Sequence, residues 1–131
     1  MRVFRSGDDT GRRETNVNEL ERRATTEALF RDVNERIAES AERFDAEETD
    51  FVCECADSSC THRVEASLAE YEEVRAEPTT FLLAPGHEQE DIERVVSDRG
   101  RFRIVEKVQS AVRRTVVRLD PRSEPAAPSE S

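Results

Sequence analysis

Residues 51–64 read Phe-Val-Cys-Glu-Cys-Ala-Asp-Ser-Ser-Cys-Thr-His-Arg-Val, and they hold all three cysteines and one of the two histidines of this 131-residue chain. The spacing is Cys53-x-Cys55-x4-Cys60-x-His62. Side chains two positions apart on an extended backbone point to the same side. A hairpin through this segment would therefore direct three thiols and one imidazole toward one point.

The residues between the two pairs have the chemistry of a turn. Asp57, Ser58 and Ser59 stand there, and Asp and Ser side chains hydrogen-bond readily to nearby backbone amides. We therefore expect Ala56–Ser59 to turn the chain, with Glu54 facing away from the cysteines on either side of it.

Three thiolates and one imidazole form a ligand set typical of tetrahedral, structural zinc. The sequence thus predicts that Cys53, Cys55, Cys60 and His62 bind Zn²⁺. A redox role for the thiols is a weaker alternative, because nearby carboxylates raise a thiol pKa. Unrelated structural cysteines and an iron–sulfur cluster are further alternatives.

Cys-x-Cys followed by Cys-x-His resembles the SWIM type of zinc finger, a module family linked to DNA binding and protein–protein contact. The chain as a whole also resembles a loose group of short bacterial proteins in which Cys-Glu-Cys precedes a Pro-Gly-His turn, here Pro85-Gly86-His87. No activity comes with this second resemblance. It does make His87 an alternative to His62 as the fourth ligand.

The composition predicts one small domain. Hydrophobic residues make up 35% of the chain and there is no Trp, so a metal ion would add stability that a small core lacks. We expect a single domain over residues 16–120, with disordered polar ends at 1–15 and 121–131. No apolar run approaches membrane-spanning length and no signal peptide is present, which predicts a soluble, cytoplasmic protein that contacts no membrane.

Charge is unevenly distributed along the chain. The net charge is −10, with −14 over residues 1–93 and +6 over residues 94–122. The two regions can neutralise each other within the fold, or the basic region can bind nucleic acid. The arginines that would carry nucleic-acid binding are Arg99, Arg101, Arg103, Arg113, Arg114 and Arg118.

A long helix is predicted over residues 17–44, because apolar residues recur there three or four positions apart. The face expected to be buried consists of Leu20, Ala24, Phe30, Val33, Ile37, Ala41 and Phe44. The face expected to be solvated consists of Glu27, Arg31, Glu35, Glu39, Glu42 and Arg43. A helix this long in so small a domain also raises the prediction of a dimer formed through it.

The rest of the chain predicts a small sheet and two shorter helices. Ser67 is the N-cap of one helix, with Glu70 three positions later. Strands are expected at 79–84 and 101–107, paired with each other, and an amphipathic helix at 108–119. Residues 92–97 have helical spacing, although a strand in a hairpin through residues 98–100 is the alternative.

The predicted fold class is therefore α+β: a long N-terminal helix, a zinc-binding hairpin, and a two- or three-stranded sheet with helices on one face. The predicted function is a small, non-enzymatic zinc protein that acts as an interaction or regulatory module. Nucleic-acid binding is the alternative. An enzyme has little support, because no phosphate-binding loop, nucleophile elbow or His-x-Glu segment is present.

Overall fold

The computed structural model describes residues 4–122, with side chains described from residue 17 onward. The elements in chain order are α1 (Phe4–Arg43), β1 (Thr49–Val52), β2 (Arg63–Ala66), α2 (Leu68–Val74), β3 (Thr80–Leu83), β4 (Glu93–Asp98), β5 (Arg103–Lys107) and α3 (Ser110–Arg118). The predicted α+β class is confirmed. The predicted disorder of residues 1–15 and 121–131 and the predicted domain range 16–120 stay predictions.

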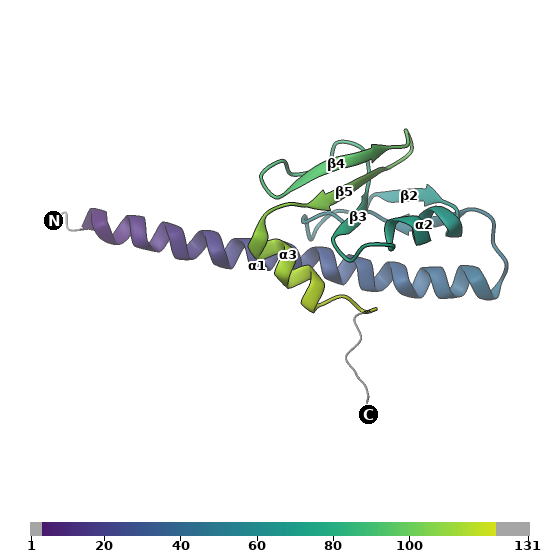
Figure 1. Ribbon diagram of the computed structural model, residues 1–131, viewed down its shortest axis with the longest axis horizontal. Coiled ribbons are helices and arrows are strands. Elements are labelled where there is room, and N and C mark those ends of the chain that lie inside the picture. Colours follow the sequence, from purple (N-terminus) through teal and green to yellow (C-terminus); the bar gives the residue numbers. More distant parts are fainter. Residues whose placement is uncertain (1–3, 123–131) are drawn as a thin grey trace, which may run out of the picture.

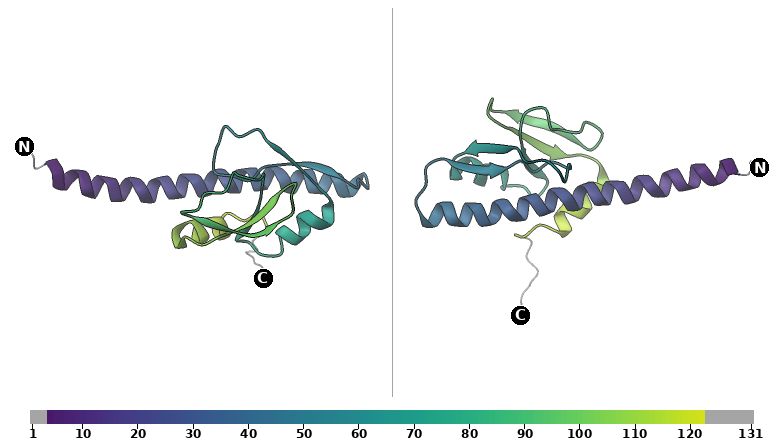
Figure 2. Two further views of the ribbon diagram at one scale, coloured as in Figure 1. Left: turned by 90° about the horizontal axis from the view of Figure 1, so that it is seen from above. Right: turned by 180° about the vertical axis from the view of Figure 1, so that it is seen from behind.

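Helix α1 is the support on which the other elements pack. It contacts α3, β1 and α2, and both sheets lie along one side of it (Figure 1). The view from behind shows the same arrangement, with α1 uncovered along its outer side (Figure 2). The helix ends in a Schellman motif, in which Asp45 takes a φ of 55° and the N–H of Ala46 donates to the carbonyl of Ala41 at 3.0 Å.

The strands form two antiparallel sheets. β1 pairs with β2, and a three-stranded sheet has the order β3-β5-β4. The predicted pairing of the 79–84 and 101–107 segments is confirmed, with Phe81 opposite Val105. The N–H of Glu54, just after β1, donates to the carbonyl of Leu82 in β3 at 2.8 Å. This hydrogen bond joins the two sheets beside the cysteines.

Helix α2 begins as the sequence predicts. Ser67 is its N-cap and forms a capping box with Glu70, since the backbone N–H of each residue donates to the side chain of the other. The Tyr71 ring of this helix stacks on Phe51 of β1 with centroids 4.6 Å apart. The helix is thereby fixed over the two-stranded sheet.

The prediction of which face of α1 is buried was partly wrong. Ala24 and Ala41 are buried as expected, but Val33 and Phe44 are exposed, whereas Glu27 and Arg31 are almost completely inaccessible to solvent. Small alanines let the helix backbone approach the sheets closely. Long charged side chains then fill the remaining space by reaching partners on the sheets.

Two groups of buried charges connect α1 to the three-stranded sheet. The ammonium of Lys107 lies 2.8 Å from the Glu27 carboxylate and also contacts Glu93. The guanidinium of Arg31 lies over the Phe81 ring, 3.5 Å from its centroid, and donates to the carbonyl of Pro78 at 2.7 Å. Each charged group lies against groups of opposite charge or against polar or aromatic groups, which lowers the free-energy cost of burying it.

Residues 92–97 do not form the helix that their spacing predicts; the strand alternative is confirmed. β4 pairs with β5 through a hairpin in which Gly100 takes a φ of 82°. Only Ile92 of the three apolar residues is buried, while Val95 and Val96 are exposed on the edge strand. Pairing with the neighbouring strand, rather than burial of one helical face, decides this segment.

Candidate metal centre

Four side chains that commonly bind metals converge next to the junction of the two sheets. Cys53, Cys55 and Cys60 come from the β1–β2 loop, and His87 comes from the connection after β3. Their ligand atoms all lie within 4.8 Å of one another. The Nδ1 atom of His87 is 3.5 Å from the Sγ atom of Cys53 and 3.6 Å from that of Cys60.

The β1–β2 loop holds its cysteines through backbone hydrogen bonds. The N–H of Cys53 donates to the carbonyl of His62 at 3.2 Å, which extends the strand pairing by one step. At the tip of the loop, the side-chain carboxylate of Asp57 accepts the N–H of Ser59 at 3.0 Å. The backbone carbonyl of Asp57 accepts the N–H of Cys60 at 2.9 Å. A turn therefore forms at residues 57–60, one residue later than predicted, and directs Cys60 back toward Cys53.

His87 reaches the cysteines because of a tight turn after β3. Its N–H donates to the carbonyl of Ala84 at 3.1 Å, and Gly86 takes a φ of 87°. Pro85 followed by a glycine with positive φ is the pattern of a type II turn. Glu88 supports the turn by accepting the N–H of Gly86 at 3.1 Å.

The pKa values of the three thiols depend on how close the thiols lie to one another. Hydrogen bonding with Cys53 lowers the pKa of Cys55 to about 5, and the same hydrogen bond together with burial raises the pKa of Cys53. Burial also raises the pKa of Cys60. The backbone N–H of Ala84 donates to the Cys53 sulfur at 3.2 Å, and this contact favours a thiolate there. A bound cation would lower all three thiol pKa values together.

His62 lies beside this group and is not one of its four members. Its side chain is exposed, and its ring meets the His87 ring edge-on with centroids 4.5 Å apart. The backbone of His62 does take part in the site, because its carbonyl accepts the N–H of Cys53. The four side chains that the structure brings together are thus the predicted cysteines and the alternative ligand His87.

Glu54, between two of the cysteines, is a supporting residue that the sequence did not reveal. Its side chain is completely buried. One carboxylate oxygen accepts the amide N–H of Asn34 at 2.7 Å, and the other accepts the N–H of Leu82 at 3.1 Å and lies 3.9 Å from Arg31. Alternation of side chains predicted only that Glu54 faces away from the cysteines. This direction leads into the protein interior only because α1 packs there, and no local sequence signal reveals that packing.

The six arginines of the nucleic-acid hypothesis do not form one free basic surface. The three arginines of the β4–β5 hairpin are each paired with a carboxylate: Arg99 with Glu73 at 2.5 Å, Arg101 with Glu70 at 2.8 Å and Arg103 with Glu88 at 2.5 Å. The acidic and basic regions of the chain therefore neutralise each other in this part of the fold.

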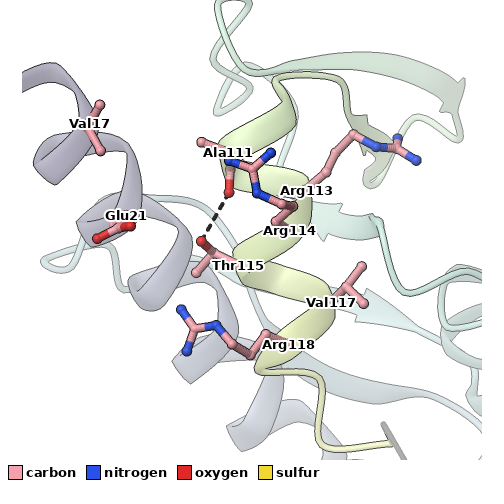
Figure 3. A pocket seen from close by; sticks show the side chains of 8 residues that line it. All are labelled: Val17, Glu21, Ala111, Arg113, Arg114, Thr115, Val117 and Arg118. Carbon is pink, nitrogen blue, oxygen red and sulfur yellow. Dashed lines mark hydrogen bonds between the residues drawn. The ribbon is translucent and has the colours of Figure 1, made fainter. Parts of the chain in front are cut away.

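The remaining three arginines lie on α3. Arg113 approaches Glu106 at 3.6 Å, whereas Arg114 and Arg118 form no ion pair with any residue between 17 and 122. All three line an open groove of about 710 Å³ between α1 and α3, together with Val17 and Glu21 (Figure 3). The groove therefore carries only three of the six predicted arginines, and the carboxylate of Glu21 lies beside them.

Comparison with protein-family models, with curated protein sequences and with solved structures finds no match to this chain. The resemblance to SWIM fingers is therefore not a family assignment. What the structure supports is a Cys3His group that can hold a metal ion such as zinc. No helix among the described residues has the length and apolar character needed to cross a membrane.

Proposed function

We propose that Cys53, Cys55, Cys60 and His87 bind one Zn²⁺ ion that stabilises the fold of a non-enzymatic interaction module. The observation that carries this proposal is the spacing of the sulfur and nitrogen atoms. In a tetrahedral site with Zn–S about 2.3 Å and Zn–N about 2.0 Å, a sulfur and a nitrogen ligand lie about 3.5 Å apart. The Nδ1 atom of His87 lies 3.5 Å and 3.6 Å from two of the sulfurs.

The number of ligands supports a structural role for the metal. Four protein ligands complete a tetrahedral shell, whereas catalytic zinc sites keep a position for water or substrate. Cys53 and Cys55 are also buried, which limits access to the metal. A closed, partly buried site is suited to holding chain segments together and not to binding a substrate.

The position of the site explains what the ion would stabilise. Its ligands come from the β1–β2 loop and from the turn after β3, so one ion would crosslink the two sheets. Binding free energy of the metal becomes folding free energy when the site exists only in the folded chain. A chain with 35% hydrophobic residues would depend strongly on such a crosslink.

A protein partner has more support than nucleic acid. The chain carries a net charge of −10, and four of the six arginines proposed for phosphate binding lie within 4 Å of a carboxylate. Nucleic-acid binding stays the alternative prediction and would rest on Arg114 and Arg118. If the chain binds nucleic acid, a mobility shift should appear at low salt and weaken steeply as salt is added. A basic surface of two arginines is too small for such binding, so we expect no shift.

Metal content measured on the purified full chain tests the proposal. We expect one zinc ion per chain after extensive dialysis. Cys55→Ser should lose the metal, while Ser59→Ala, in the same loop but outside the ligand group, should keep it. A folded chain that contains no zinc and has three thiols reactive toward a thiol reagent would overturn the proposal.

A further inference from the structure

Helix α1 has a second apolar face that the domain does not cover. Leu29 is 62% exposed, Val33 is 39% exposed and Phe44 is 74% exposed. At about 100° per residue these side chains share one side of the helix, opposite the buried Ala24 and Ala38. We call Leu29, Val33 and Phe44 the outer stripe; the half-buried Ile37, which packs against the core, borders it.

The outer stripe ends in a shallow groove. This groove of about 320 Å³ lies where α1 meets the segment leading to β1, and it is lined by Ile37, Ser40, Ala41, Phe44, Ala46, Glu48 and Thr49. Leu29 is the apolar side chain at the other end of the stripe. Fifteen residues separate Leu29 and Phe44, which is about 22 Å along a helix.

The charges beside the outer stripe are balanced, although the chain as a whole is strongly acidic. Asp32, Arg36, Glu39 and Arg43 lie along one flank of the stripe, and Arg36 pairs with Asp32 at 3.4 Å. Two chains of net charge −10 repel each other overall, so association is favoured where the contact surface itself adds no like-charge contacts. This flank, with two acids and two bases, is such a surface.

We propose that the outer stripe of α1 packs antiparallel against the outer stripe of a second copy of this chain. In a twofold-symmetric antiparallel pair the same flank of each helix meets its equivalent. With Leu29 of one copy beside Phe44 of the other, Leu29 enters the groove next to Phe44. The symmetry then repeats this contact at the opposite end, so that each helix supplies both an apolar side chain and a groove.

The flanking charges favour the same direction and register. The pairing of Leu29 with Phe44 brings Arg36 within about one helical turn of Glu39 of the second copy, and Arg43 equally close to Asp32 of the second copy. Four acid–base pairs thus form across the interface. The two copies of Arg36 also approach each other near the twofold axis, and each pairs with Asp32 of its own chain. A parallel pair would place this charged flank against the apolar edge of the second helix, and no such pairs would form. This inference does not depend on the metal site.

Sedimentation of the full chain, combined with a charge exchange, tests the proposal. Wild-type protein should be a dimer. Leu29→Arg and Phe44→Glu should each raise the dimer dissociation constant by roughly 100-fold or more, because each change affects two symmetric contacts. Val96→Glu, at a valine on β4 that is 46% exposed, is the control and should leave the dimer unchanged.

The two changes combined distinguish the antiparallel register. Either the double variant or an equal mixture of the two single variants should dimerise again, because the new guanidinium and carboxylate then face each other. Far-UV circular dichroism should stay unchanged throughout, since both positions are exposed. A monomeric wild-type chain, a dimer that tolerates both single changes, or a double variant that stays monomeric would each overturn the proposal.

Discussion

The Nδ1 atom of His87 lies 3.5 Å from the Sγ atom of Cys53, although 34 positions separate the two residues in the chain. Cys53 follows β1 of the two-stranded sheet and His87 follows β3 of the three-stranded sheet. Near the site, the sheets are also joined by the hydrogen bonds between Leu82 and Glu54 and by the one from the Ala84 N–H to the Cys53 sulfur. A metal ion at this point would therefore fix the relative position of the two sheets.

Replacing the two histidines separately should identify the fourth ligand. We expect His87→Ala to weaken zinc binding by more than about 100-fold, since even residues outside the coordination shell contribute about 10–100-fold. His62→Ala should weaken it far less, because His62 contacts the His87 ring and not the thiol group. Competition with a chromogenic chelator measures both. Equal losses, or a greater loss for His62→Ala, would contradict the assignment of His87.

Removal of the metal should loosen the site before the rest of the domain. With a strong chelator and a reductant present, hydrogen exchange should accelerate at the amides of Cys53, Ala84 and His87, which are all hydrogen-bonded in the site. The amides in the centre of α1 should respond less. The melting temperature should also fall, and added zinc should restore it. If the exchange rates of these amides are the same with and without chelator, no metal stabilises the loop.

Loss of the Glu54 carboxylate should destabilise the protein and weaken metal binding together. Glu54→Ala leaves the buried Arg31 guanidinium without its acidic partner and removes the acceptor for Asn34 and Leu82. Breaking a buried pair in this way costs about 3–5 kcal/mol. Denaturant unfolding measures the loss. Glu65→Ala, at an exposed position of β2, should change stability by less than about 0.5 kcal/mol.

The buried Glu27 should make stability fall as the pH rises. Burial raises the pKa of its carboxyl from 4.5 to about 7, although Lys107 opposes the shift. The folded chain therefore holds this proton between pH 4.5 and 7 while the unfolded chain releases it, and up to about 3 kcal/mol is lost across that window. Glu27→Gln should remove this dependence.

Denaturant unfolding at pH 6 and pH 8 tests the role of Glu27. The variant should gain stability relative to wild type at the higher pH, since Lys107 keeps its contact with Glu93. Comparing the two proteins at each pH cancels the effect of protons on the metal ligands, which the two proteins share. A variant less stable than wild type by the same amount at both pH values would mean that Glu27 is ionised in the folded protein across this range.

The strands at 79–84 and 101–107, the cap of α2 and the metal-ligand types could be predicted from the sequence, whereas residues 92–97 have helical spacing and form a strand. The Ser67–Glu70 capping box and the pairing of the strand at 79–84 with that at 101–107 follow from local patterns. The cysteines were recognised from their spacing. Choosing between His62 and His87 needs the path of the chain after β3, which spacing alone does not give.

The buried face of α1 could not be predicted in the same way. Hydrophobicity assigns Glu27 and Arg31 to solvent and Val33 and Phe44 to the core, and the structure has the reverse. The charged side chains are buried where Lys107 and Glu54, distant in the sequence, lie next to them. Burial of a charge depends on its partner, and the partner is known only once the fold is known.

X-ray absorption at the zinc edge, on protein purified without added metal, tests the central claim most directly. The account predicts one zinc per chain with three sulfur neighbours at about 2.3 Å and one nitrogen neighbour at about 2.0 Å. In His87→Ala the nitrogen from imidazole should be lost and in His62→Ala it should stay. A zinc ion surrounded by oxygen, or a folded chain without zinc, would contradict the account.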